Sequence, residues 1–184
     1  MNEKELIEKA KKGDKSALAK LVKAQEKTVY NFAFKICRNP EQAENIMQET
    51  FLSMIKSLHQ FDGNSKLTTW LYRIISNHCL MAYRKKKTQF LSFDEDNDIE
   101  NKISNDWNVI PSNVIENNEL KDILDKAINK LAPDYRIVFI LRDVNGFSTE
   151  ETGKITSLSI PAVKSRLHRA RAFLRNEINE AFKK

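Results

Sequence analysis

Residues 148–171 read STEETGKITSLSIPAVKSRLHRAR, and this stretch predicts two helices joined by a very short connection. Ser148 followed by Glu151 has the spacing of a capping box, which predicts a helix from here to about Thr156. After residues 157–159 a second helix begins near Ile160, because apolar residues then recur at helical spacing on one face. The inward positions are Val163, Leu167, Ala170, Leu174 and Ile178.

The remaining face of this second helix is strongly basic. It carries Lys164, Ser165, Arg166, His168, Arg169 and Arg171. Two helices joined by about three residues, the second one basic, have the dimensions of a helix-turn-helix whose second helix enters the major groove. Arginine and lysine can bond guanine edges or phosphates there. The stretch therefore predicts a reader of duplex DNA; a basic helix that only completes a bundle is the alternative.

The rest of the chain also predicts helices. Four glycines and four prolines in 184 residues, with Leu, Ile, Lys, Glu and Ala between them, are typical of long helices. Apolar periodicity predicts helices over about 3–12, 15–36, 40–58, 67–87, 120–131 and 133–144. The expected fold class is all-α, with two small helical domains.

Charge divides the chain into three parts. Residues 88–119 contain eight acidic side chains and one lysine, whereas the whole chain has a net charge of +6. We therefore expect domains at 1–87 and 119–184, both basic, separated by a largely flexible acidic linker at 88–118. Cationic domains favour a polyanionic partner, since each phosphate contact releases counterions. Nucleic acid is the first candidate; a solvated lysine-rich surface is the alternative.

Several classes of protein are not expected. The chain has no apolar run long enough to span a bilayer and no secretory signal, so we expect a cytoplasmic protein. Cys37 and Cys79 fall on helical stripes and fit buried thiols better than a disulfide framework. The cysteines and His59, His78 and His168 lack metal-ligand spacing, so we expect no metal and no cofactor.

The first half contains a helix with two distinct faces. Asn39-Pro40 is a strong helix start, and Ala43, Ile46, Met47, Thr50, Phe51, Met54, Ile55 and Leu58 then form an inward stripe. The other face presents Gln42, Asn45, Gln48, Glu49, Ser53 and Lys56. The loop 61–66 and a helix ending in the basic run 84–87 follow. Such a polar strip is usually solvated, but it also suits a protein partner.

Four stretches resemble one family. Residues 141–151 (LRDVNGFSTEE) and 162–171 (AVKSRLHRAR) closely resemble region 4 of the extracytoplasmic-function (ECF) sigma factors, small relatives of the bacterial sigma-70 family. Residues 43–51 (AENIMQETF) look like region 2.2 of that family, and 61–74 (FDGNSKLTTWLYRI) look like regions 2.3 and 2.4. The resemblance implies an alternative sigma factor that binds core RNA polymerase, recognises minus-35 and minus-10 promoter elements and opens the duplex.

The resemblance also implies site residues. It assigns Lys164, Ser165, Arg166, Arg169 and Arg171 to the minus-35 element. It assigns Phe61, Asn64, Ser65, Lys66, Arg73, Asn77, Arg84 and Lys85 to the minus-10 element, where flipped bases are held by stacking and hydrogen bonds. Asn45, Gln48, Glu49 and Ser53 would dock the clamp helices of the largest polymerase subunit. Trp70 and Tyr72 could stack on bases, but Trp70 lies on the apolar stripe, which favours the core.

The resemblance implies further partners. These are the polymerase flap and an anti-sigma factor, possibly membrane-bound, that masks the polymerase-binding surfaces until an envelope or environmental stimulus arrives. The linker would run through the polymerase toward the RNA exit path. No small-molecule substrate is implied.

A few positions depart from the family pattern. Thr152 and Gly153 stand where the family usually has an apolar residue and alanine, Ser157 replaces the common turn glycine, and Asn45 replaces an acidic residue.

Two rival functions are considered. An operator-binding regulator would use only the helix-turn-helix, and the region 2 resemblance speaks against it. An enzyme would need clustered carboxylates for metal, or a positioned nucleophile and base, whereas the acidic residues here lie along helix faces or in the linker.

Overall fold

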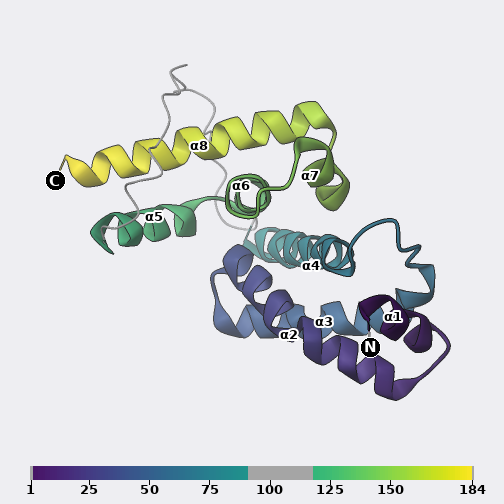
Figure 1. Ribbon diagram of the computed structural model, residues 1–184. Helices are drawn as coiled ribbons and strands as arrows, with labels where there is room; N and C mark the ends of the chain where they lie inside the picture. Colours follow the sequence, from purple (N-terminus) through teal and green to yellow (C-terminus); the bar gives the residue numbers. More distant parts are fainter. Residues whose placement is uncertain (1, 91–117, 184) are drawn as a thin grey trace.

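The computed structural model describes residues 2–90 and 118–183, with side chains for 2–85 and 121–183, and contains no strand within these ranges (Figure 1). The all-α prediction is confirmed. The first half contains α1 (Glu3–Lys11), α2 (Lys15–Cys37), α3 (Pro40–Ser57), the 3₁₀ turn η1 (Leu58–Gln60) and α4 (Leu67–Phe90). The second contains α5 (Asn118–Lys130), α6 (Pro133–Phe139), the π-helical turn η3 (Ile140–Val144), α7 (Thr149–Thr156) and α8 (Ile160–Phe182).

Side chains at the helix N-termini fix where the helices begin. Asp14 accepts hydrogen bonds from the backbone N–H groups of Ser16 and Ala17 at the start of α2. Asn39 accepts from Gln42 N at 2.8 Å, and Pro40 follows at the first position of α3, where its missing N–H costs nothing. The starts expected at Asp14 and Asn39 are therefore confirmed.

Helix α4 lies at the centre of the molecule (Figure 1). Leu67, Leu71 and Ile75 on one side of it are at most 1% exposed and belong to the core that α2 and α3 share. The helix continues to Phe90, beyond residue 87, so the basic run 84–87 lies inside the helix rather than at its end. The linker expected at 88–118 falls, for residues 91–117, outside the described residues.

The two halves pack directly against each other. Ile137, Ile140, Leu141 and Ile155 from the second half belong to the same buried apolar cluster as the core of the first half. On α4, the ring of Tyr72 stacks on Phe32 at 4.0 Å between centroids and meets Phe147 edge-on at 5.8 Å. Figure 1 shows α4 between the α2/α3 pair and the α6/α7 pair. In this structure Tyr72 is therefore covered by aromatic rings.

Two arginines add polar contacts between the halves. Arg136 on α6 is only 6% exposed and donates to the carbonyl of Ile36 at the end of α2. It also donates to the carbonyls of Asn129 and Leu131, and its burial lowers the pKa of its guanidinium. Arg38, in the left-handed conformation at the α2 C-terminus, bonds the Asp125 carboxylate at 3.2 Å and the Asn129 side chain. A buried charge is tolerated only with such partners.

One inward prediction for α3 is wrong. Ile55 is 47% exposed, because at 100° per residue it lies at the margin of the face centred on Ala43, Thr50 and Met54.

In the second half, α8 packs across α5, α6 and α7 through Val163, Leu167, Ala170 and Leu174. These four inward positions of α8 are confirmed.

Candidate nucleic-acid interface

The turn between α7 and α8 has a tight geometry. Ser148 accepts from Glu151 N at 3.1 Å, and the Glu151 carboxylate accepts from Ser148 N at 2.7 Å, which completes the predicted capping box. Hydrogen bonding to the Glu151 carboxylate, first from the Ser148 backbone N–H and then from the Ser148 side chain, lowers the pKa of Glu151. Ser157 then adopts φ 57°, and Ser159 caps α8 by accepting from Ala162 N at 3.3 Å. The turn thereby sets the direction in which α8 leaves.

Lys164, Ser165 and Arg169 are exposed on α8, outside its buried stripe. Arg169 lies 3.5 Å from the hydroxyl oxygen of Tyr135, measured from its Nη1. A cationic and hydroxyl-bearing helix face that reaches solvent can contact phosphates and base edges. The structure thus brings three of the five residues assigned to the minus-35 element to one open surface.

The other two α8 residues are held by acidic partners. Arg166 is half-buried and lies 3.5 Å from the Asp134 carboxylate. Arg171 donates two hydrogen bonds to Asp143, at 2.7 and 2.6 Å, and this pairing raises the pKa of its guanidinium. A bidentate arginine–carboxylate pair is the stronger of these arrangements. Arg171 therefore ties α8 to the end of η3 in this structure.

The loop at 61–66 begins with a buried residue. Phe61 is 4% exposed, packs on Trp70 at 5.3 Å between centroids, and is covered by the ammonium of Lys11 at 5.9 Å. In this structure the Phe61 ring is therefore covered by the core and by α1, and its assignment to a DNA contact stays a prediction. Trp70 itself is half-buried against Phe61, in line with the core placement.

The tip of the same loop is exposed and internally bonded. Asp62 accepts from the backbone N–H of Asn64 at 2.9 Å and from its side-chain amide at 2.7 Å. These bonds, the backbone one first, lower the pKa of Asp62. Ser65 and Lys66 are exposed, as is Asn64. The Asp62 carboxylate thus fixes the Asn64 amide, while Ser65 and Lys66 point to the surface.

The loop leads into a polar stripe along α4. Arg73, Asn77 and Arg84 are exposed and, at spacings of four and seven, lie on one face of the helix; Lys85 is exposed beside them. This face is separate from the one that carries Tyr72 toward the second half. The exposed loop tip and the exposed stripe that follows it in the chain together are the candidate surface for a nucleic-acid strand.

The exposed face of α3 is mixed rather than purely polar. Asn45, Gln48 and Glu49 are exposed, and Leu52 between them is 57% exposed. Glu49 bonds His78 Nδ1 at 3.1 Å, and Ser53 bonds His78 Nε2 at 2.9 Å. The residues predicted on this face are therefore brought together, with Ser53 half-buried against α4.

Sequence reasoning missed part of this surface. Leu52, Ile55 and Met81, at 57%, 47% and 64% exposure, place large apolar side chains on the outer sides of α3 and α4. His78 was also missed as the residue that links Glu49 and Ser53. A leucine in an otherwise polar strip was the available signal. A groove of about 380 Å³ lies beside Gln48, lined by Glu26, Lys27, Tyr30, Glu44 and Met47.

Within residues 2–90 and 118–183, no helix is long and apolar enough to cross a membrane. The same part of the chain holds no group of three or more His, Cys, Asp or Glu side chains placed to bind a metal ion.

Comparisons with known proteins agree with the order of these surfaces along the chain. Residues 21–89 match the family model for sigma-70 region 2, and residues 121–174 match that for sigma-70 region 4. The ECF RNA polymerase sigma factor SigW of Bacillus subtilis is 32% identical over 182 residues, covering 96% of this chain and 97% of SigW. The ECF RNA polymerase sigma-E factor of Escherichia coli K12 is 29% identical, covering 94% of this chain and 92% of that protein.

Solved structures show the same fold. The sigma factor RpoE in complex with the anti-sigma factor NepR, from Bartonella quintana, is 25% identical with a TM-score of 0.60, covering 91% of this chain and 98% of that one. CnrH in complex with the cytosolic domain of CnrY is 21% identical with a TM-score of 0.62, covering 95% and 96%. From the two family matches and the near full-length similarity to SigW, the chain belongs to the sigma-70 family, as one of its ECF sigma factors.

Proposed function

We propose that this chain is an alternative sigma factor that binds core RNA polymerase, recognises minus-35 and minus-10 promoter elements and initiates transcription. The observation that carries the proposal is the succession of two family regions, each with its own exposed polar surface: the α3/α4 surface in the first and the α8 surface in the second. The domains are assigned to 1–87 and 119–184 with the acidic linker 88–118 between them. The chain acts as a transcription regulator, without catalytic residues of its own.

The minus-35 element is assigned to α8. Lys164, Ser165 and Arg169 are exposed there and supply donors for base edges and phosphates. Arg166 and Arg171 reach DNA only by exchanging Asp134 and Asp143 for phosphate. Losing an arginine that pairs with guanine costs roughly 1 to 3 kcal/mol and relaxes one base position.

The minus-10 element is assigned to the loop tip and the α4 stripe. Asn64, Ser65 and Lys66 would receive the extruded base, and Arg73, Asn77, Arg84 and Lys85 would follow the strand. The support is exposure, since all seven side chains reach solvent in this structure. Phe61, also predicted for this element, is buried beneath the loop in this structure and would have to become exposed to reach DNA.

The core polymerase is assigned to the α3 face. Asn45, Gln48, Glu49 and Ser53 supply polar contacts, and Leu52, Ile55 and Met81 add the apolar area that a stable protein interface needs at its centre. His78 fixes the Glu49 and Ser53 side chains. The partner surface is the clamp helices of the largest subunit, with the flap contacting the second domain.

Regulation by an anti-sigma factor, possibly membrane-bound, completes the proposal. The support is the similarity to RpoE, which was solved as a complex with an anti-sigma factor. Since polymerase and promoters are cytoplasmic in bacteria, we assign the chain to the cytoplasm.

Run-off transcription from a genomic fragment library tests the proposal. Bacterial core polymerase with this protein should start at new sites that share a two-block upstream motif, and core polymerase alone should not. Tight duplex binding by the protein alone, without new start sites, would instead establish an operator-binding regulator.

A further inference from the structure

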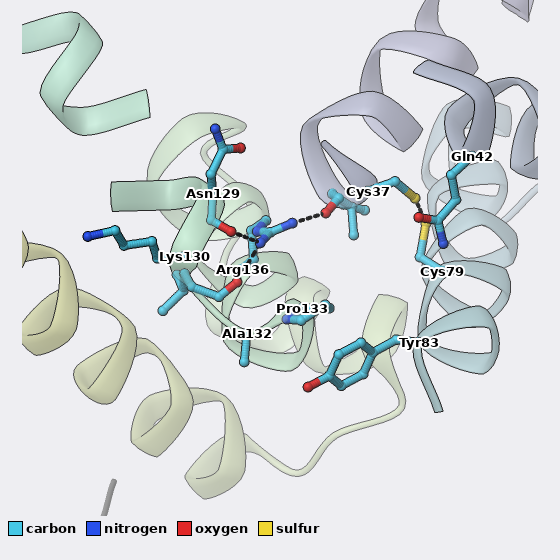
Figure 2. Close-up of a pocket in the computed structure, with 11 residues that line it drawn as sticks. Cys37, Gln42, Cys79, Tyr83, Asn129, Lys130, Ala132, Pro133 and Arg136 are labelled. Atoms are coloured by element: carbon cyan, nitrogen blue, oxygen red, sulfur yellow. Dashed lines mark hydrogen bonds between the residues drawn. The ribbon is translucent and has the colours of Figure 1, made fainter. Parts of the chain in front are cut away.

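The two cysteines of the chain meet between helices that are distant in sequence. Cys37 is the last residue of α2, and Cys79 lies on α4; their sulfur atoms are 3.3 Å apart without a disulfide bond. Both line a cavity of about 390 Å³ at the junction of the two halves, together with Tyr83, Pro133 and Arg136 (Figure 2). Figure 2 shows the two sulfur atoms facing each other, with Arg136 reaching toward the end of α2.

We propose that Cys37 and Cys79 form a redox-active dithiol, which a hydroperoxide converts into an intramolecular disulfide. In the first step the Cys37 thiol releases its proton and the thiolate attacks the peroxide; the O–O bond breaks, a sulfenic acid forms, and the departing alkoxide or hydroxide takes up a proton to give an alcohol or water. In the second step the Cys79 sulfur attacks the sulfenic sulfur, the S–O bond breaks, and water leaves with the Cys79 proton. Both sulfur atoms are oxidised and the peroxide is reduced.

The geometry fits this chemistry. A disulfide requires its sulfur atoms at about 2.05 Å, so the pair needs to approach by only about 1.2 Å, which small side-chain rotations provide. Cys79 is 3% exposed and Cys37 is half-buried, so an oxidant in the cavity meets Cys37 first. The hydrogen bond with Cys37 and burial raise the pKa of Cys79, which agrees with Cys37 as the sulfur that reacts first.

The location couples the dithiol to the packing of the two halves. Ile36, directly before Cys37, accepts the hydrogen bond from buried Arg136 of α6. Arg38, directly after it, bonds Asp125 of α5. A covalent bond from Cys37 to α4 therefore fixes the turn of α2 that both arginine contacts use. Oxidation should tighten the attachment of α5 and α6 to the first half.

Peroxide treatment of the reduced full-length protein tests the first part. Alkylation and intact-mass measurement should show that the alkylatable thiols fall from two to none, with a mass loss of two hydrogen atoms that dithiothreitol reverses. Trypsin should release one linked species, joining residues 36–38 to residues 74–84. The Cys37→Ala and Cys79→Ala variants should each give a sulfenic acid or an intermolecular dimer instead. In wild-type protein, retained thiols or only intermolecular links would overturn the proposal, whether or not either variant folds.

Hydrogen–deuterium exchange tests the coupling. Backbone amides of α6 should exchange several-fold more slowly in the oxidised protein than in the reduced protein, and in Cys37→Ala peroxide should leave the exchange rate of α6 unchanged. A disulfide that forms without slowing α6 would overturn the coupling. Neither readout involves polymerase or promoter DNA, so their failure is distinct from failure of the proposed function.

Discussion

At the scale of single residues, Gly153 sets the spacing of the turn between α7 and α8. A Cβ added there would lie 2.8 Å from the backbone carbonyl oxygen of Leu158. Alanine favours a helix by about 1 kcal/mol over glycine, but overpacking costs about 1 to 3 kcal/mol. Gly153→Ala should therefore lower the free energy of unfolding by about 1 kcal/mol, measured by chemical denaturation. A more stable variant would show that the turn can move away from the added methyl group.

A substitution at Ser157, in the same turn, should change the free energy of unfolding in the opposite direction. Its φ of 57° lies in the left-handed region, which costs an ordinary residue about 1 to 2 kcal/mol and glycine almost nothing. Ser157→Gly should therefore raise the unfolding free energy by about 0.5 to 1 kcal/mol, after the entropy that glycine adds to the unfolded chain. The matched control is Ser159→Ala, which removes the α8 cap and should destabilise by about 1 kcal/mol. Equal effects of both changes would contradict the argument.

Residues with partners nearby in sequence were predictable, and those with distant partners were not. The Asn39 cap and the Ser148–Glu151 box join groups three residues apart, so local spacing was enough to find them. Arg136 bonds a carbonyl one hundred residues away, and nothing local distinguishes it from a surface arginine. The burial of Phe61 was not predicted for the same reason, because part of its cover comes from Lys11 of α1.

At the scale of helices, the proposal for α8 predicts that substitutions at different positions of the helix affect promoter binding in different ways. Lys164→Ala should weaken promoter binding by the polymerase complex on all sequences, and should reduce the salt slope by about 1 if the lysine meets a phosphate. Arg169→Ala should instead weaken the base preference at one position of the minus-35 element. Fluorescence anisotropy over a salt series, with a set of single-base promoter variants, measures both effects.

Lys183→Ala is the control for these α8 variants. Lys183 carries the same charge just beyond the C-terminal end of α8, where it pairs with Glu180. It should leave binding unchanged. If it weakened binding as much as Lys164→Ala does, the effect would come from net charge and not from a recognition surface.

The exposed face of α3 predicts a loss of affinity without a loss of stability. Leu52 is 57% exposed, so Leu52→Ala should change the unfolding free energy by less than about 0.5 kcal/mol. A central interface leucine loses about 1 to 2 kcal/mol of binding when truncated, so affinity for core polymerase should fall about 5- to 30-fold. Phe182→Ala, which changes an equally exposed apolar residue on α8, should leave that affinity intact. Equal losses of affinity in the two variants would indicate non-specific hydrophobic binding.

Helix periodicity predicted which faces are buried, but not where a face ends. The stripe of α3 was found from its spacing, yet Ile55 at its margin lies outside the core. Leu52 was overlooked because an apolar residue at an outward position has no use within its own domain. Apolar residues that lie outside the buried stripe of α3 therefore mark the surface proposed for a partner.

At the scale of the whole molecule, the contact between the halves could not be read from the sequence. An acidic linker predicts two separate domains, whereas Ile137, Leu141 and Ile155 join the core of the first half. Each of these residues fits the apolar stripe of its own helix, so the pattern does not reveal which partner covers it. The family resemblance supplied the order of the regions but not this packing.

The proposed function requires this packing to open. Promoter elements about 25 base pairs apart are separated by about 85 Å along B-form DNA. A compact chain of this length has a radius of gyration of only about 16 Å, so the packed form cannot bind both elements at once. Tyr72 and Phe147 should therefore separate when polymerase binds.

Energy transfer between dyes on the two halves measures this opening. Lys20 on α2 and Asn176 on α8 are exposed, and cysteines placed there in a Cys37→Ala/Cys79→Ala background accept the dyes. Transfer should be efficient in the free protein and should fall on addition of core polymerase. The reason is that the free energy of binding to separated surfaces on the polymerase exceeds the few kcal/mol that the contact between the two halves contributes. Phe147→Ala removes one ring from the contact and should shift the free protein part of the way to the open state. Unchanged transfer in an active polymerase complex would mean that the two halves bind DNA without separating, and the assignment of α8 to the minus-35 element would then be wrong.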